Sequence, residues 1–310
     1  VENLTKKYGE QTAVDNLSFY VEKGQIYDFL GPNGAGKTTT MNIMTGYLAA
    51  TRGTVTINGY DIMEQPEQAK KCIGYLPEIP PLYPDMTVLE YLRFVAELKK
   101  ISKKERLPHI QEVMQRIGIT DVEGRLIKNL SKGYKQRVGL AQALIGYPDV
   151  IILDEPMVGL DPKQIIEIRT LIKQLSKKHT ILLSSHILSE VNTICDHILI
   201  LSHGRLAASG SPKELQKLMR KSTEIEVTAM GNEEAAQEVF GAMVQIASFD
   251  FLDSTEEGGI TAKIVTKDNA DIRKELSVAL TNAGMPVLSM KKLEKSLEDI
   301  FLQLTESQEG

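Results

Sequence analysis

The sequence predicts an α/β protein whose larger domain contains a parallel β-sheet covered on both faces by helices. Three observations support this: strand-like and helix-like segments alternate in the second half of that domain, a helical block interrupts it, and a different order of elements follows near the C-terminus. The alternating segments lie at residues 149–156, 162–177, 179–186, 187–194 and 197–210. Strands that alternate with helices are typical of parallel sheets, because each crossover helix packs against the sheet.

The N-terminal elements are predicted from short apolar runs. Residues 1–27 indicate short strands separated by glycine-containing turns. The run GQIYDFL at 24–30 predicts a buried strand, although it contains Asp28 and an unpaired buried carboxylate is costly. Residues 39–48 predict a helix, and the alternating pattern of GTVTINGYDI predicts one further strand at 53–62.

A glycine-rich loop lies between the strand at 24–30 and the helix that follows. Gly31, Gly34 and Gly36 allow the loop to wrap so that successive N–H groups point inward, which makes an anion site at a helix N-terminus. The side chain of Lys37 adds a positive charge, and the hydroxyl of Thr38 is a ligand for Mg²⁺. The pattern G-x-x-x-x-G-K-[ST] is a P-loop, which predicts binding of a nucleoside triphosphate.

A helical block follows the N-terminal strands. Apolar residues recur at helical spacing through residues 85–129, for example at Leu89, Leu92 and Val95. We therefore predict a helical subdomain, inserted at about 79–140, within the α/β domain.

The last 90 residues predict a second domain, at 221–310. Their pattern reads β-α-β-β-α-β, the ferredoxin-like order of an α+β domain, and Ser296 with Asp299 predicts a capping box for a final short helix. This part carries a net charge of −9, whereas residues 1–220 carry +4. The change in charge supports a boundary near 219–223 and argues against nucleic-acid binding by the C-terminal part.

The run VIILDE at 150–155 predicts a buried strand that ends in two acids. Asp154 would lie near the P-loop and hold Mg²⁺ directly or through water, and Glu155 would orient the attacking water. The alternative is a strand that merely ends in two solvated acids. The P-loop upstream favours the first interpretation.

A second anion site is predicted in NLSKGYKQRVGLAQAL, which precedes the acidic strand. Ser131 and Gly133 would present a hydroxyl and an N–H at a helix start. One phosphate does not need two such sites from one subunit, so two facing copies of the chain explain both. The segments GLDP, with Asp161, and SSHIL, with His186 at a strand end, complete the set.

Composition limits the possible classes of protein. The 310 residues are 42% hydrophobic and 25% charged, which is ordinary for a globular protein. No apolar stretch approaches 18 residues, so we expect no membrane span, and no secretion signal is visible. Cys72 and Cys195 lie far apart without metal-binding spacing, and we expect them to be reduced thiols in the cytosol.

With these segments in this order, residues 1–220 resemble the ATP-binding-cassette (ABC) ATPases. The chain is most similar to the cassettes that work with a separately encoded export-type permease, of the drug and sodium exporter kind. Its C-terminal extension, which ends SLEDIFLQLT, resembles that group as well. The implied fold is a P-loop NTPase cassette with a helical subdomain, followed by the small ferredoxin-like domain.

The resemblance also implies roles for the matching residues, with ATP and Mg²⁺ as cofactors. Tyr8 would stack on adenine, Val14 would contact the nucleoside, and Asp161 would bridge the two subunits. Ser131 and Gly133 would contact the γ-phosphate of the partner's nucleotide. The other implied phosphate contacts are Asn33, Gly34, Ala35, Gly36, Lys37, Thr38 and Thr39. The implied metal contacts are Thr38, Asp154 and Glu78, and the implied catalytic residues are Lys37, Glu78, Glu155, as general base, and His186.

Three residues depart from the common family pattern. Glu78 stands where glutamine is usual, and an ionised glutamate binds metal more strongly but cannot donate a hydrogen bond. Lys132 and Tyr134 replace common residues of the signature around Ser131 and Gly133. Because Ser131 and Gly133 remain, these changes indicate a subgroup variant.

The resemblance implies a transport ATPase that dimerises head-to-tail and drives the export of a substrate through a separate permease. It also implies that the chain is a peripheral subunit at the cytoplasmic face of the cell membrane. Permease contact is expected at 79–92. Two alternatives stay open: an ATP-binding partner with weak or no hydrolysis in a heterodimer, and a soluble ABC ATPase acting on nucleic acid or ribosomes. We expect no nucleic-acid partner, because the +4 cassette has no strongly basic surface. The sequence names neither the cargo nor the partner cassette.

Overall fold

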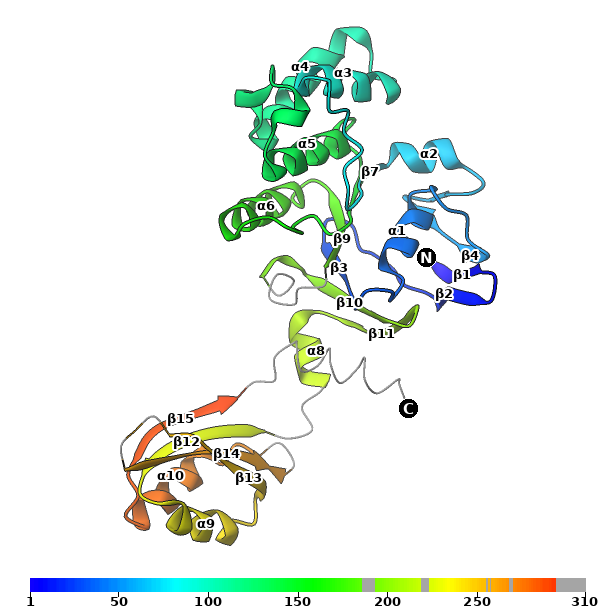
Figure 1. Cartoon of the computed structure of the whole chain (residues 1–310). Coiled ribbons are helices and arrows are strands. Elements are labelled where there is room, and N and C mark those ends of the chain that lie inside the picture. The colour runs from blue at the N-terminus through cyan, green and yellow to red at the C-terminus, as the bar shows by residue number, and fades with distance from the viewer. Residues whose placement is uncertain (186–192, 219–222, 255, 257, 268–269, 294–310) are drawn as a thin grey trace. The chain divides into compact units, whose positions relative to one another are not determined.

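The computed structural model describes residues 1–185, 193–218, 223–254, 256, 258–267 and 270–293. The chain divides into two compact units, of which the first contains Val1–Pro212 and the second begins at Lys213. Figure 1 shows both units, and each is described by itself. The division into domains at 220/221 stays a prediction.

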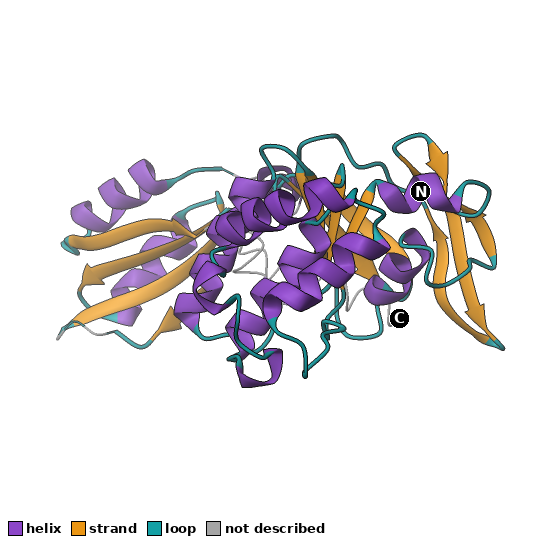
Figure 2. Ribbon diagram, turned by 90° about the horizontal axis from the view of Figure 1, so that it is seen from above, coloured by secondary structure: helices purple, strands orange, loops and turns teal. Residues whose placement is uncertain are grey.

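A six-stranded sheet forms the centre of the first unit. Its strand order is β11-β10-β3-β9-β8-β7, and all neighbours are parallel except the edge pair β10 and β11. The strands are β3 (Ile26–Leu30), β7 (Ile73–Leu76), β8 (Val150–Leu153), β9 (Thr180–Ser185), β10 (His197–Ser202) and β11 (Arg205–Gly210). Helices lie on both sides of these strands (Figure 2), so the predicted α/β class is confirmed.

The register of the parallel strands aligns their carboxyl ends at one edge of the sheet. Leu76 pairs with Leu153, and Leu153 pairs with Leu183 on the next strand. The segments that follow β3, β7 and β8 therefore emerge at the same edge of the sheet. These are the segments that contain the P-loop, Glu78 and the acidic pair.

Short antiparallel strands accompany the central sheet in the N-terminal part. The strands β1 (Glu2–Tyr8), β2 (Gln11–Leu17) and β4 (Arg52–Thr54) form one sheet, and β5 (Thr56–Ile57) pairs with β6 (Tyr60–Asp61). The prediction of a single strand at 53–62 was wrong. Asn58 and Gly59 have positive φ angles of 50° and 89° and turn the chain between β5 and β6.

The first helix, α1 (Lys37–Met44), packs against one face of the central sheet through a shared hydrophobic core. Phe29, Ile152 and Leu182 of the sheet share one buried cluster with Met41 and other residues of α1. The helix predicted at 39–48 is α1, which begins two residues earlier and ends four residues sooner than predicted, so that it starts within the P-loop motif. A second helix, α2 (Pro66–Lys71), precedes β7.

The helical block contains three α-helices and two short 3₁₀ turns. They are α3 (Val88–Leu98), α4 (Lys103–Ile117), η1 (Thr120–Val122), η2 (Ile127–Asn129) and α5 (Lys132–Leu144). Thr87 begins α3 with a capping box, in which its hydroxyl accepts from the Glu90 N–H and the Glu90 carboxylate accepts from the Thr87 N–H. The helix α6 (Pro162–Leu175) then follows the acidic strand.

The second unit has the predicted β-α-β-β-α-β order. Its elements in that order are β12 (Glu224–Met230), α9 (Glu233–Ala242), β13 (Ile246–Leu252), β14 (Gly259–Thr266), α10 (Arg273–Asn282) and β15 (Val287–Leu293), and the helix α8 (Pro212–Leu218) precedes them along the chain. The sheet order β13-β14-β12-β15 is antiparallel throughout, with α9 and α10 on one face (Figure 1). The predicted capping box at Ser296 and Asp299 lies outside the described residues, as does most of the helix predicted at 187–194.

Close packing between β7 and α5 makes one glycine indispensable. A Cβ atom added at Gly74 would collide with the carbonyl group of Ala143, which is backbone and has little freedom to move. We expect Gly74→Ala to destabilise the protein by about 1–3 kcal/mol, as overpacking does in other cores. Urea denaturation measures this change.

The matched control for that prediction is Gly124→Ala, since a Cβ atom at Gly124 would meet nothing within 4 Å. Its unfolding free energy should stay within about 0.5 kcal/mol of the wild type. Equal stability of both variants would contradict the packing argument.

Within the described ranges, no helix is both long enough and apolar enough to cross a membrane.

Candidate nucleotide-binding site

One cavity of about 490 Å³ lies above the carboxyl edge of the central sheet. The whole predicted phosphate loop, Asn33–Thr39, lines it together with Tyr8, Glu78 and Glu155. Tyr8 is 50% exposed at the end of β1, with the Lys6 ammonium 5.0 Å from its ring centroid. The cavity therefore joins an exposed aromatic ring, a phosphate-type loop and two carboxylates.

Val14 does not line this cavity. Its side chain is completely buried in the core below the loop, and Thr12 and Ala13 line the cavity in its place. A Cβ atom at Gly36 would lie 2.6 Å from the Ala13 carbonyl oxygen and 3.4 Å from Cγ2 of Val14. Val14 thus supports the loop from beneath, in contrast to its predicted contact with the nucleoside.

The loop itself requires glycine at its centre. Gly36 is the N-cap of α1 with φ of 97°, and Gly34 has φ of 85°. Lys37 follows and is only 6% exposed. Its Nζ donates to the carbonyl oxygens of Gly31 at 2.7 Å and Pro32 at 3.3 Å, and lies 3.9 Å from Oε1 of Glu155. The ammonium of Lys37 is thus held within the loop, beside the acidic strand.

The two acids after β8 share one organising hydroxyl. Ser184 Oγ on β9 donates to Oδ1 of Asp154 at 2.6 Å and accepts from the N–H of Glu155 at 2.9 Å. Asp154 is 1% exposed, and Glu155 has a positive φ of 48°. Sequence reasoning gave Ser184 no role, although it stands in the quoted SSHIL segment. His186, two residues further, lies outside the described residues.

The donor atoms around the acidic strand fit a hard divalent cation. Oδ2 of Asp154 is buried and has no hydrogen-bond partner within the part of the chain that the structure describes. An orphaned buried carboxylate oxygen is costly unless a cation binds it. Thr38, Asp154 and Glu78, the three predicted metal residues, line one hollow together. All three offer oxygen, the ligand that Mg²⁺ prefers, and Mg²⁺ usually keeps several waters as well.

That hollow, which we call the groove, has a volume of about 790 Å³ and extends away from the nucleotide cavity. It is lined by Thr38, Asn42, Thr45, Gly46, Tyr47, Lys70, Ile73, Tyr75, Pro77, Glu78, Ile79, Pro81, Lys99, Gln142 and Asp154. Two large side chains on it face solvent, Tyr47 at 84% and Ile79 at 83% exposure. Desolvation lowers the pKa of Lys99 to about 8. Glu78 lines both hollows and so connects the groove to the nucleotide cavity.

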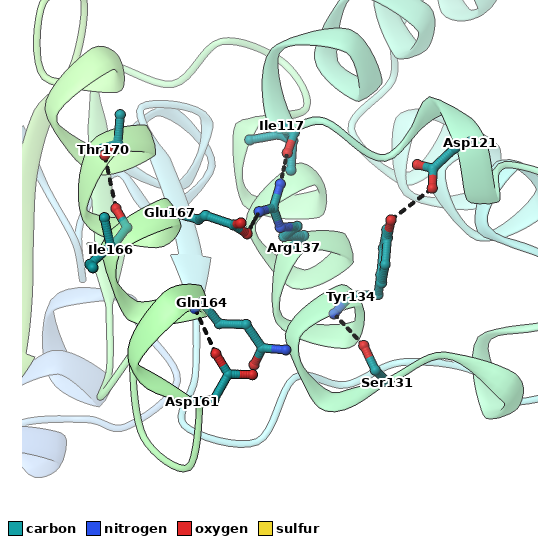
Figure 3. A network of polar contacts seen from close by, with 10 residues as sticks. All are labelled: Ile117, Asp121, Ser131, Tyr134, Arg137, Asp161, Gln164, Ile166, Glu167 and Thr170. Carbon is teal, nitrogen blue, oxygen red and sulfur yellow. Dashed lines mark hydrogen bonds and ion pairs between the residues drawn. The ribbon is translucent and has the colours of Figure 1, made fainter.

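Three predicted residues lie apart from the nucleotide cavity, around the start of α5 (Figure 3). Ser131 caps α5, and its Oγ accepts from the N–H of Tyr134 at 3.4 Å. Asp161 caps α6, and its Oδ1 accepts from the N–H of Gln164 at 2.9 Å. A Cβ atom at Gly133 would meet the Gln164 side chain at 2.8 Å, so the two helix starts pack against each other.

The substituted signature residue Tyr134 turns away from that surface. Its hydroxyl donates to Oδ2 of Asp121 in η1 at 2.7 Å (Figure 3). Arg137, one turn further along α5, donates to the Ile117 carbonyl oxygen and to the Glu167 carboxylate of α6. These bonds tie the start of α5 to the helical block and to α6, which positions Ser131 and Gly133.

Comparison with known proteins gives a consistent result. A family model described as ABC transporter matches residues 14–158. The bacitracin transport ATP-binding protein BcrA of Bacillus licheniformis is 36% identical over 305 residues, covering 97% of this chain and 95% of that protein. The linearmycin resistance ATP-binding protein LnrL of Bacillus subtilis is 32% identical, covering 98% of this chain and 97% of that protein.

Solved structures resemble about two thirds of the chain. An ATP-binding subunit of an ABC transporter is 32% identical with a TM-score of 0.64, covering 70% of this chain and 91% of that one. A dimeric ATP-binding cassette in a post-hydrolysis state, bound to ADP and phosphate, is 26% identical with a TM-score of 0.61, covering 68% of this chain and 97% of that one.

Proposed function

Because the chain belongs to the ABC transporter family of ATP-binding cassettes, we propose that it binds ATP with Mg²⁺ above its P-loop and hydrolyses the nucleotide to drive transport through a separate permease. The observation that carries this proposal is the meeting of Lys37, the acidic pair and Ser184 at one sheet edge. A P-loop alone indicates binding, whereas an ordered acid beside it supplies the means of hydrolysis.

In this proposal, the ammonium of Lys37 binds the phosphates of ATP in place of its two carbonyl partners. The N–H groups of Asn33–Thr39 and the positive end of α1 surround the phosphates, and Tyr8 stacks on the adenine. Thr38 and Asp154 would hold Mg²⁺, with Glu78 beside them, and the ion would supply charge neutralisation on the phosphates. His186 keeps its proposed γ-phosphate contact on sequence grounds.

Glu155 acts as the general base. Its carboxylate lines the cavity, and its N–H donates to Ser184 from a backbone conformation with positive φ that is uncommon for a non-glycine residue. Strain of this kind often occurs at catalytic positions. Glu155 takes a proton from the attacking water, while Lys37 and the surrounding N–H groups stabilise the charge that develops on the phosphate.

A second cassette completes the site. Ser131, Gly133 and Asp161 do not line the nucleotide cavity of their own chain, yet Ser131 and Gly133 form an anion-binding helix start. We propose that two copies face each other head-to-tail, so that these residues reach the partner's nucleotide. The resemblance to a dimeric cassette supports this arrangement.

The permease is proposed to dock on the groove. Ile79 and Pro81, from the segment where permease contact is predicted, line it, and Tyr47 adds exposed apolar surface. The chain would then be held at the cytoplasmic face of the membrane. The relatives named for bacitracin transport and linearmycin resistance favour export, with an antibiotic as cargo.

Reconstitution tests the proposal. The chain is co-expressed with the membrane protein encoded beside it, and the purified complex is placed in vesicles. We expect ATP-dependent cargo movement and a raised rate of phosphate release. Ile79→Asp should weaken co-purification, whereas Lys100→Asp, at an exposed position that does not line the groove, should not. No cargo movement in these vesicles, with a rate of phosphate release that the membrane protein does not change, would contradict the transport function.

A further inference from the structure

Tyr75, on β7, makes two hydrogen bonds that connect three elements of the cassette. Its hydroxyl donates to Oδ1 of Asn42 in α1 at 3.1 Å. Its carbonyl oxygen accepts from Nε2 of Gln142 in α5 at 2.5 Å. None of these three residues belongs to a site predicted from the sequence, and they lie far apart along the chain.

Each of the three elements carries part of the proposed machinery. The helix α1 begins with Lys37 and Thr38, and α5 begins after Ser131. Three residues beyond Tyr75, the chain reaches Glu78. The two bonds of Tyr75 therefore join the phosphate-binding helix, the segment of Glu78 and the signature helix.

The same three side chains line the groove. Desolvation, followed by the nearby charge of Asp154, raises the pKa of Tyr75 above its ordinary value, so the hydroxyl stays protonated and donates at neutral pH. The wall of the groove is partly shielded from water, and a hydrogen bond between the phenol and the amide stabilises the fold there, because a buried polar group without a partner is costly. A partner that occupies the groove would lie directly against this bond.

We propose that Tyr75 is a positioning residue for ATP hydrolysis, acting through its hydrogen bond to Asn42. The bond holds α1 in register with β7, so that Thr38 and Glu78 keep their relative positions around the metal and phosphates. The inference rests on the proposed function, since it assigns a positioning contact to the same site.

The test is a double-mutant cycle on turnover. Tyr75→Phe removes only the hydroxyl, and Asn42→Leu replaces the amide, with its Oδ1 acceptor, by an apolar side chain of similar volume. One lost hydrogen bond corresponds to a decrease of about three- to tenfold in kcat. We expect each single variant to show this decrease, with the dissociation constant for ATP unchanged, and the double variant to lose no more than either single variant.

Tyr147→Phe is the matched control. Its hydroxyl also donates to an acceptor, the Glu112 carboxylate, but Tyr147 lines neither the groove nor the nucleotide cavity. It should leave kcat unchanged. Thermal unfolding of all variants, followed in parallel, separates loss of turnover from loss of folded protein.

Two results would overturn the inference: wild-type kcat in Tyr75→Phe, or fully additive losses in the double variant. A rise in the KM for ATP with kcat unchanged would also contradict it, because the bond would then serve binding alone. These outcomes differ from failure of the proposed function, in which the wild-type chain itself would show no ATP turnover.

Discussion

Glu155→Gln is expected to slow ATP hydrolysis by about 10²–10⁴-fold while ATP binding is retained. The amide has the size of the carboxylate but cannot accept a proton from water. The N–H of Glu155 still donates to Ser184, so the strained backbone and the adjacent Asp154 stay in place. Loss of the negative charge 3.9 Å from Nζ of Lys37 also leaves that ammonium more available to the phosphates.

Phosphate release under saturating ATP and Mg²⁺ measures the turnover, and titration calorimetry measures the binding. Size-exclusion chromatography should show an ATP-dependent dimer in the variant, because nucleotide is bound and not consumed. Glu97→Gln, an exposed acid of α3 paired with Arg106, is the matched control and should hydrolyse at the wild-type rate. Unchanged turnover in Glu155→Gln would remove the assignment of Glu155 as the general base.

Local patterns allowed much of the site to be predicted. The P-loop, the acidic pair and the helix start at Ser131 are each contained within a few consecutive residues, and their chemistry follows from residue type and spacing. The structure brings the P-loop, Glu78 and Glu155 to one cavity because parallel strands end at one edge. That rule depends only on fold class, which the alternation of strands and helices indicates.

The remaining features depend on which strands become neighbours, and sequence spacing does not give this. Ser184 reaches Asp154 because β9 lies between β3 and β8, and Tyr75 reaches Asn42 because α1 packs near β7. Val14 was misplaced for the same reason: its burial depends on how β2 passes beneath the loop. Asp28 is fully buried, as its strand predicts.

Gly133→Asp is expected to reduce hydrolysis by roughly 10²–10³-fold, because it removes a phosphate-binding surface and puts a negative charge there. The effect should arise on the partner's nucleotide, since Gly133 does not line the cavity of its own chain. Gly133→Ala introduces the same Cβ contact with the end of the Gln164 side chain but no charge, and it should lose much less activity. Nucleotide binding to the isolated chain should be unchanged in both variants.

Mixing two inactive variants decides whether each nucleotide is shared between subunits. Lys37→Ala inactivates the P-loop and leaves the signature around Ser131 and Gly133 intact. Gly133→Asp inactivates the signature and leaves the P-loop intact. In a head-to-tail dimer of one chain of each kind, one site has both intact halves and the other has neither. If sites work independently, a one-to-one mixture should regain about a quarter of the wild-type rate, because half of the dimers are mixed and each has one working site. If the P-loop and the signature of one chain served the same nucleotide, no mixed dimer would contain a working site, and the mixture would stay as inactive as its two components.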